Sequence, residues 1–177
     1  MTVIGHGSAE PTIRAARPED APAIAKALLE APRFDGTLSE RDLPDLVERA
    51  IAAIGGDQET MLVAELDGAA AGYTHVHWVS ALFLSGPEGY VTELFVQRGA
   101  RGRGCGSALL QAVEAIALER KAARVFLLNG RQSEAYSGGF YPKRGFVEAV
   151  HLAVFRRELS ARVRTGPNQR PAADASR

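Results

Sequence analysis

The sequence is poor in cysteine and has no excess of charge of either sign, and each absence excludes a class of protein. The 177 residues contain Cys105 alone, so no internal disulfide forms, which fits a reducing compartment. Basic and acidic residues number 21 each, which does not indicate a basic surface for nucleic acid. No apolar run approaches the roughly 18–20 residues that cross a bilayer, and residues 1–11 do not resemble a secretory signal. These absences predict a cytoplasmic protein without nucleic-acid or membrane partners.

The length and composition predict one globular domain. A chain of 177 residues can bury one proper core, and its 46% hydrophobic and 24% charged residues are ordinary values for a globular protein. Residues 1–11 are small and polar, and we expect them to be flexible. Residues 160–177 mix Arg, Pro, Ala and Asn without apolar periodicity, which predicts a disordered tail. The folded domain should therefore cover residues 12–159.

Hydrophobic periodicity predicts strands and helices in alternation within that domain. Strands are expected over residues 12–16, 61–66, 70–79, 90–96, 124–128 and 146–157. Helices are expected from Pro18 onward and over residues 39–54, 107–121 and 133–141. Asp67-Gly68 is a hairpin signal, and Gly55-Gly56 should end the second helix. The order predicts an α/β fold with a mixed, mostly antiparallel central sheet flanked by helices.

A glycine-rich loop between a buried strand and a helix carries the clearest functional signal. It consists of Arg101, Gly102, Arg103, Gly104, Cys105, Gly106 and Ser107. Glycines at alternate positions remove Cβ atoms that would block a ligand, and the N–H groups at a helix start bind phosphate oxygens. Arg101 and Arg103 add positive charge. The loop is therefore predicted to hold a pyrophosphate.

Two common nucleotide motifs do not fit this loop. The pattern G-x-x-x-x-G-K-[ST] is absent because no lysine stands at the required place. The spacing Gly102-x-Gly104-x-Gly106 also differs from the dinucleotide fingerprint, and no acidic residue ends the strand expected near residues 124–129. A nucleotide-phosphate-binding module stays an alternative hypothesis.

Three motifs, in this order along the chain, resemble the GNAT family of N-acetyltransferases. They are Ile13-Arg14-x-Ala-x-x-x-Asp20, then Leu94-Phe95-Val96 with the glycine loop and Leu109-Leu110, then Phe140-Tyr141-Pro142-Lys143-Arg144-Gly145-Phe146. The resemblance implies the GNAT fold, acetyl-CoA as co-substrate, and direct attack by a primary amine in a ternary complex. It also implies that main-chain groups of Leu94, Phe95 and Val96 bind the acetyl carbonyl and the pantetheine arm. A non-catalytic acyl-CoA sensor is the other alternative.

Acetyl transfer to an amine needs a base, donors for the carbonyl oxygen and a proton for the departing thiolate. Glu93 is the candidate base, because it shares a strand face with Val91 and Phe95 in a strand otherwise suited to burial. Tyr141 is the candidate acid, since the resemblance places this phenol beside the sulfur. The simpler interpretations are a solvent-facing or arginine-paired Glu93 and a core aromatic at Tyr141.

Other polar and reactive residues receive weaker predictions. His75 and His77 alternate on one strand face with Tyr73, but no further ligand cluster completes a metal set, so no metal is predicted and His75 is assigned to a substrate-pocket wall. Cys105 stands at a helix start, where a thiol pKa can fall, yet its place among glycines favours a small residue beside phosphate.

The sequence says least about the acceptor. The resemblance places the acceptor pocket at the loop between the first two helices, which contains Phe34 and Asp35. Acidic residues near this pocket would suit a cationic amine. They are Asp35, Glu88, Glu93 and Glu134. A small-molecule amine and a protein amine both stay open, as does a homodimer.

Overall fold

A computed structural model describes residues 10–31, 38–155 and 157 of the chain. Two compact units emerge: one comprises residues 1–31 and 39–128, and the other comprises residues 32–38 and 129–177. The first unit contains the whole sheet and its covering helices. The described residues of the second contain two short helical turns, Glu134–Ser137 and Pro142–Arg144. The single domain over residues 12–159 stays a prediction.

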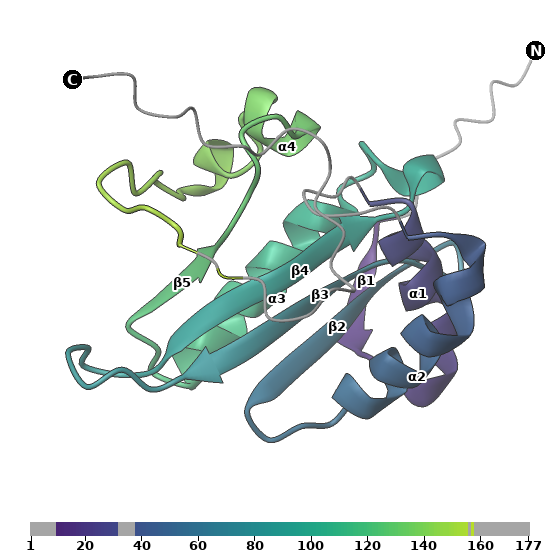
Figure 1. Cartoon of the computed structure of the whole chain (residues 1–177), viewed down its shortest axis with the longest axis horizontal. Coiled ribbons are helices and arrows are strands. Elements are labelled where there is room, and N and C mark those ends of the chain that lie inside the picture. The colour runs from purple at the N-terminus through teal and green to yellow at the C-terminus, as the bar shows by residue number, and fades with distance from the viewer. Residues whose placement is uncertain (1–9, 32–37, 156, 158–177) are drawn as a thin grey trace, which may run out of the picture. The chain divides into compact units, whose positions relative to one another are not determined.

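A five-stranded mixed sheet forms the centre of the first unit, in the order β1-β2-β3-β4-β5 (Figure 1). The strands are β1 (Thr12–Ala15), β2 (Glu59–Leu66), β3 (Ala69–Val79), β4 (Glu88–Val96) and β5 (Arg124–Leu127). The first four run antiparallel to their neighbours, whereas β5 is parallel to β4. The predicted fold class, a mixed and mostly antiparallel sheet flanked by helices, is confirmed.

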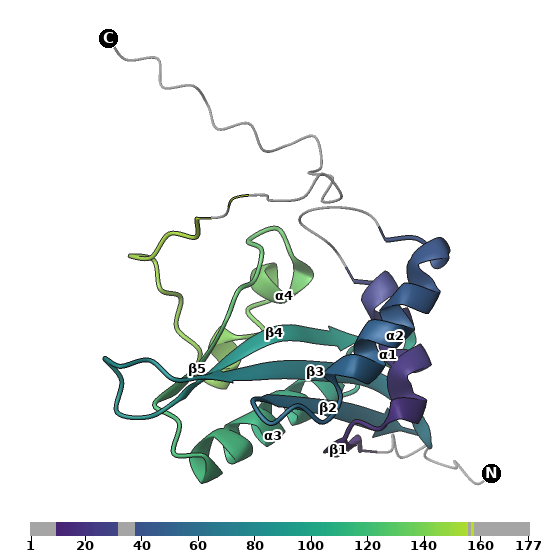
Figure 2. The same cartoon turned by 60° about the horizontal axis from the view of Figure 1, so that its bottom comes forward.

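Helices cover both faces of the sheet. The helix α3 (Cys105–Glu119) lies on one face, while α1 (Ala21–Leu29) and α2 (Leu43–Ala53) lie together on the other (Figure 2). Each side has its own core: Leu109 and Val113 of α3 pack with Val76 and Val91, whereas the α1–α2 side contains Tyr73. None of the helices in the described residues is long and apolar enough to cross a membrane.

The turn between β2 and β3 is the hairpin turn that Asp67-Gly68 predicted. Asp67 and Gly68 adopt φ angles of 54° and 78°, the left-handed pair that a tight two-residue hairpin requires. Next to this turn Glu65 pairs with Ala70, but Ala64 pairs with Gly72. One additional residue of β3 is therefore accommodated, which shifts the register of the rest of the hairpin by one position.

Like β3, β4 contains a bulge of one extra residue. Because of this bulge, the predicted face of Glu93 is wrong. His75 pairs with Glu93 while Val76 pairs with Val91, so Thr92 is an extra residue in β4. Val91 packs in the core on the α3 side, whereas Phe95 packs on the α1–α2 side. Glu93 consequently does not share a face with Val91, because the bulge interrupts the period of two on which that prediction rested.

The first GNAT-like motif corresponds to an ion pair between β1 and the turn that follows it. The guanidinium of Arg14 makes two contacts with the carboxylate of Asp20, Nη1 to Oδ2 at 2.7 Å and Nη2 to Oδ1 at 2.8 Å. These hydrogen bonds hold the pKa of the buried Asp20 carboxyl below its usual value. Asp20 also accepts from the Arg17 N–H at 2.8 Å and so fixes the start of α1.

Two predicted elements of the second unit are wrong in extent. The helix expected over residues 133–141 is only α4 (Glu134–Ser137), because Gly138 and Gly139 follow and Gly139 adopts a φ of 64°. The strand expected over residues 146–157 is not formed by the described residues 146–155, whose Val147 and Phe155 are 91% and 94% exposed. Apolar, β-branched composition favours a strand only where a partner strand is paired with it.

Candidate active site

A cavity of about 310 Å³ lies between the sheet and the helices α1 and α2. Its apolar wall includes Ile24, Leu28 and Met61. Its polar lining groups are Arg49 of α2, Tyr73, His75 and His77 of β3, and Thr92 and Glu93 of β4. A mainly apolar hollow with a few convergent polar groups is the usual form of a small-molecule site.

Glu93, the predicted base, faces this cavity and is held by one hydrogen bond. The hydroxyl of Tyr73 donates to Glu93 Oε2 at 2.8 Å, and Tyr73 itself is 0% exposed. A buried tyrosine that donates to a carboxylate fixes its orientation and leaves the other oxygen directed elsewhere. The hydrogen bond shows that Glu93 is positioned by Tyr73, and its role as the base stays a prediction beside the simpler interpretation of a solvent-facing carboxylate.

Glu59, which no sequence motif singled out, contacts both histidines. Glu59 pairs with His77 across β2 and β3, and its Oε2 lies 2.9 Å from His75 Nε2. Its Oε1 lies 3.5 Å from His77 Nδ1. His75 lines the cavity, and its role in binding substrate stays a prediction. The expectation that no further ligand cluster joins the two histidines is wrong, because Glu59 completes a group of three. The periodicity of β2 alone gave no signal for this contact, because the bulge beside the hairpin turn sets it.

The strands β4 and β5 part halfway along β4. Their ladder runs from Glu88↔Arg124 to Val91↔Leu127, whereas β4 continues five residues further, to Val96. The N–H of Gln97 donates to Ala71 on the β3 side at 2.9 Å. Since main-chain groups alternate between the two edges of a strand, Leu94 and Val96 direct theirs toward the parted side.

Only two of the three predicted strand residues therefore face the parting. Phe95 is paired with Tyr73 in the β3–β4 ladder, and its main-chain groups point to β3. The carbonyl oxygen of Val96 accepts from Arg101 Nε at 3.2 Å. The main-chain groups of Leu94 and the N–H of Val96 thus point toward the parted edge, on the side away from β3.

The glycine loop leads from this edge into α3 with the backbone that its glycines permit. Gly102 and Gly104 adopt φ angles of 76° and 85°, and Gly104 is the N-cap of α3. The first helical hydrogen bond runs from the N–H of Ala108 to the carbonyl of Gly104, at 3.0 Å. The N–H groups of Cys105 and Gly106 thus belong to the first turn, where a helix supplies no acceptor of its own.

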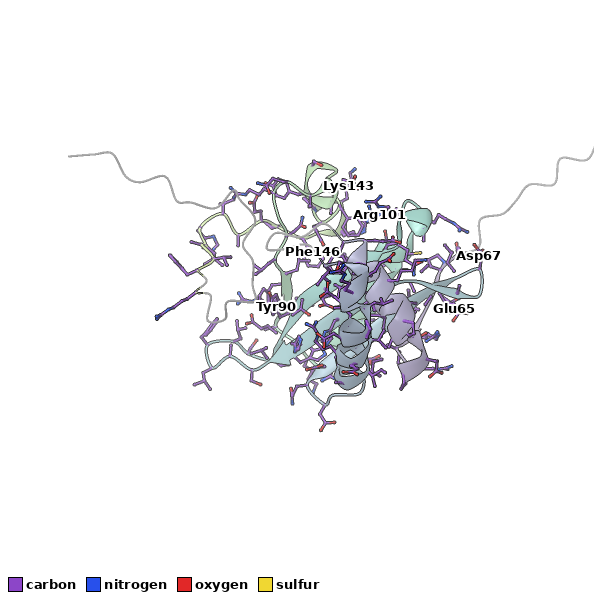
Figure 3. All side chains as sticks on the ribbon, turned by 45° about the vertical axis from the view of Figure 1, so that its right-hand side comes forward. Glu65, Asp67, Tyr90, Arg101, Lys143 and Phe146 are labelled. Carbon is purple, nitrogen blue, oxygen red and sulfur yellow. The ribbon has the colours of Figure 1, made fainter. Side chains whose placement is uncertain are left out.

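The two arginines of the loop point to different partners. Arg103 Nη2 lies 2.9 Å from Asp67 Oδ2 in the β2–β3 turn, so this side chain ties the loop to the hairpin. Arg101 contacts the end of β4. Figure 3 labels Asp67 at the turn and Arg101 in the loop before α3. Both guanidinium groups place positive charge near the start of α3.

Cys105 faces the core, which corrects the expectation for its thiol. The residue is 1% exposed and packs with the α3-side cluster. Burial raises the pKa of the Cys105 thiol rather than lowering it. A buried thiol with a raised pKa is a poor nucleophile, so Cys105 serves the packing of α3 and offers its main chain to the loop.

Tyr141, the predicted acid, belongs to the second unit. It precedes a short turn, Pro142–Arg144, and its ring meets those of Phe140 and Phe146 edge-on at centroid distances of 5.0 and 6.0 Å. Burial raises the pKa of the Tyr141 phenol. The predicted acceptor residues Phe34 and Asp35 lie outside the described residues.

The mixed sheet thus has one parallel pair, β4 and β5, which parts beside the glycine-capped helix α3. The family described as "Acetyltransferase (GNAT) family" matches residues 23–146. The chain therefore belongs to the GNAT family, whose acetyltransferases use acetyl-CoA as co-substrate. No curated protein sequence matches the chain significantly.

Solved structures share the fold. A transcriptional regulator from Bacillus halodurans C-125 superposes with a TM-score of 0.70 at 23% identity, covering 84% of this chain and all (100%) of that one. An aminoglycoside acetyltransferase from an uncultured soil metagenomic sample gives 0.64 at 17% identity, with 85% and 97% covered. A ribosomal-protein-alanine N-acetyltransferase from Brucella melitensis biovar Abortus 2308 gives 0.61 at 21%, with 83% and 99% covered. At these identities the likeness concerns the fold alone.

Proposed function

We propose that this protein transfers the acetyl group of acetyl-CoA to a primary amine, by direct attack in a ternary complex. The observation that carries the proposal is the position of Glu93. This carboxylate lines the cavity and belongs to β4. Beyond Val91, β4 parts from β5, and the chain then continues into the glycine-capped helix α3. One continuous segment of chain would then supply the base, the main-chain donors and the helix start for the phosphates, which supports the proposal.

Each group has a distinct role in this proposal. Glu93 accepts the proton of the amine, directly or through water, while Tyr73 holds the carboxylate in place. The N–H groups of Leu94 and Val96 donate to the acetyl carbonyl and to the pantetheine amides. The loop of residues 101–107 binds the pyrophosphate, and Tyr141 protonates the departing sulfur. The thioester supplies the acetyl group and its activation.

Acetyl-CoA turnover against a panel of amines tests the function itself. The panel should contain an aminoglycoside and an alanine-terminated peptide, because solved structures of this fold are acetyltransferases named for such acceptors. A polyamine and a free amino acid complete it. We expect thiol release that depends on the amine, together with a product whose mass has gained one acetyl group.

Two results would contradict the proposal. Tight CoA binding without turnover of any amine would favour the acyl-CoA sensor. Displacement of CoA by ATP at similar concentration would favour the nucleotide-phosphate module. Phe34 and Asp35 stay predicted acceptor-binding residues, as do His75 and Glu93. Alanine variants of Phe34 and Asp35 should change KM for the amine that is found.

Replacing Gly104 with Val should weaken CoA binding. A residue with a Cβ is strained at a φ of 85°, by roughly 1–2 kcal/mol, and relief of that strain moves the N–H groups that would bind phosphate. We expect calorimetry to give a Kd for CoA raised about tenfold or more.

Gly99→Val is the matched control for this experiment. Gly99 precedes the same loop, has no positive φ, and an added Cβ there meets nothing within 4 Å. Its CoA affinity should equal that of the parent. If Gly104→Val folds, as judged by circular dichroism, and keeps the parental affinity, the pyrophosphate site lies elsewhere.

A further inference from the structure

Three potential metal ligands meet on the α1–α2 face of the sheet. His75 and His77 stand two residues apart on β3, and their rings lie 4.5 Å apart between centroids. Glu59 of β2 reaches both rings with different oxygens, at 2.9 Å and 3.5 Å. One ligand atom from each of these three residues lies within 4.8 Å of the others. Adjacent strands therefore already hold the three donors together.

The distances suit a small ion of the zinc type. Zinc binds imidazole nitrogen and carboxylate oxygen at about 2.0–2.2 Å, so donors at the corners of a tetrahedron lie about 3.4 Å apart. Glu59 Oε2 lies 2.9 Å from His75 and Oε1 lies 3.5 Å from His77, and one donor atom from each of the three residues lies within 4.8 Å of the others, so the donors are already close to that separation. Small rotations of side chains whose backbones are fixed by the β2–β3 ladder suffice to admit an ion.

The donor types select the class of metal. Two imidazole nitrogens with one carboxylate favour Zn²⁺ and its transition-metal neighbours over Mg²⁺ or Ca²⁺, which prefer oxygen ligands. Glu59 contributes one negative charge, and the half-buried position of the set reduces competition from water. His75 is only 8% exposed, so one ligand is already desolvated and ordered.

We propose that Glu59, His75 and His77 bind one divalent transition-metal ion, with Zn²⁺ as the natural probe. His75 and His77 line the cavity that Glu93 also lines, so an ion held by these histidines would be accessible from that space. Three protein ligands with one position left to water or substrate is the arrangement of an accessible zinc site rather than a closed structural one. The inference does not depend on the proposed acetyl transfer.

Calorimetric titration of tag-free, chelator-treated protein with Zn²⁺ tests the site. We expect saturable binding at one ion per chain and no comparable binding of Mg²⁺. Glu59→Gln and His77→Ala should each weaken Zn²⁺ binding at least about 100-fold, since even outer-shell changes cost about 10–100-fold. His151→Ala is the matched control, because His151 is exposed and lies in the second unit, and it should bind Zn²⁺ like the parent.

The visible absorption of bound Co²⁺ reports metal coordination directly. Replacing a residue that serves only the structure would not change it. In the parent, visible absorption of tetrahedral Co²⁺ should appear in proportion to protein and saturate at one equivalent. Glu59→Gln keeps a side chain of the same shape that can still hydrogen-bond His75, so it should fold and yet lose this spectrum. Parental Zn²⁺ affinity in both folded variants would overturn the proposal, as would the absence of saturable binding to the parent.

Discussion

Glu93→Gln is expected to lower kcat by about 10²–10⁴-fold, the usual cost of losing a general base. Glutamine keeps the size of the side chain and an oxygen that accepts from the Tyr73 hydroxyl, so the cavity should be preserved. What disappears is the capacity to accept the proton of the amine. Because binding of acetyl-CoA does not require that proton transfer, its Kd should change by less than about threefold.

The measurement is steady-state turnover with the best amine of the panel, together with calorimetric CoA binding. Glu114→Gln is the control, since Glu114 is exposed on α3 and the same chemical change there should leave kcat unaltered. Glu93→Asp should retain part of the activity, because the carboxylate survives at a shorter reach. A kcat within about threefold of the parent at several pH values would reject Glu93 as the base.

Tyr141→Phe is expected to lower kcat at saturating acetyl-CoA and amine by about 10²-fold or more, with little effect on acetyl-CoA binding. The ring that packs against Phe140 and Phe146 is kept, so the variant removes the hydroxyl alone. Burial raises the pKa of this phenol, which keeps it protonated at working pH. It can then donate to the thiolate that forms as the carbon–sulfur bond breaks.

A core role for Tyr141 makes the opposite prediction. If the ring matters only for packing, Tyr141→Phe should keep the parental kcat, and Tyr141→Leu should act through the melting temperature. Tyr136→Phe is a control within the same unit, because Tyr136 donates its hydroxyl to Glu148 at 3.0 Å and has no assigned catalytic role. A kcat within about twofold of the parent for Tyr141→Phe would leave water as the proton donor.

Local chemistry was sufficient for most of the secondary structure of the first unit. Apolar periodicity predicted its strands and helices to within a few residues, and Asp67-Gly68 and the glycines after β4 marked their turns. These features depend on the conformational preferences of neighbouring residues, so a short stretch of sequence is enough to predict them. The same local reasoning failed at residues 146–155, where β-propensity is strong but no strand forms.

The faces on which the site residues lie were decided only by the tertiary structure. If the pairing beside the Asp67-Gly68 turn had continued without the shift, Val76 instead of His77 would stand opposite Glu59, and the two histidines would lie on the other face of the sheet. Without Thr92 as an extra residue, Glu93 would likewise stand opposite Thr74, on the other face from Tyr73 and His75. A shift of one residue reverses every side chain that follows it. A bulge depends on how one strand pairs with its neighbour, so hydrophobic periodicity within a single strand does not encode it.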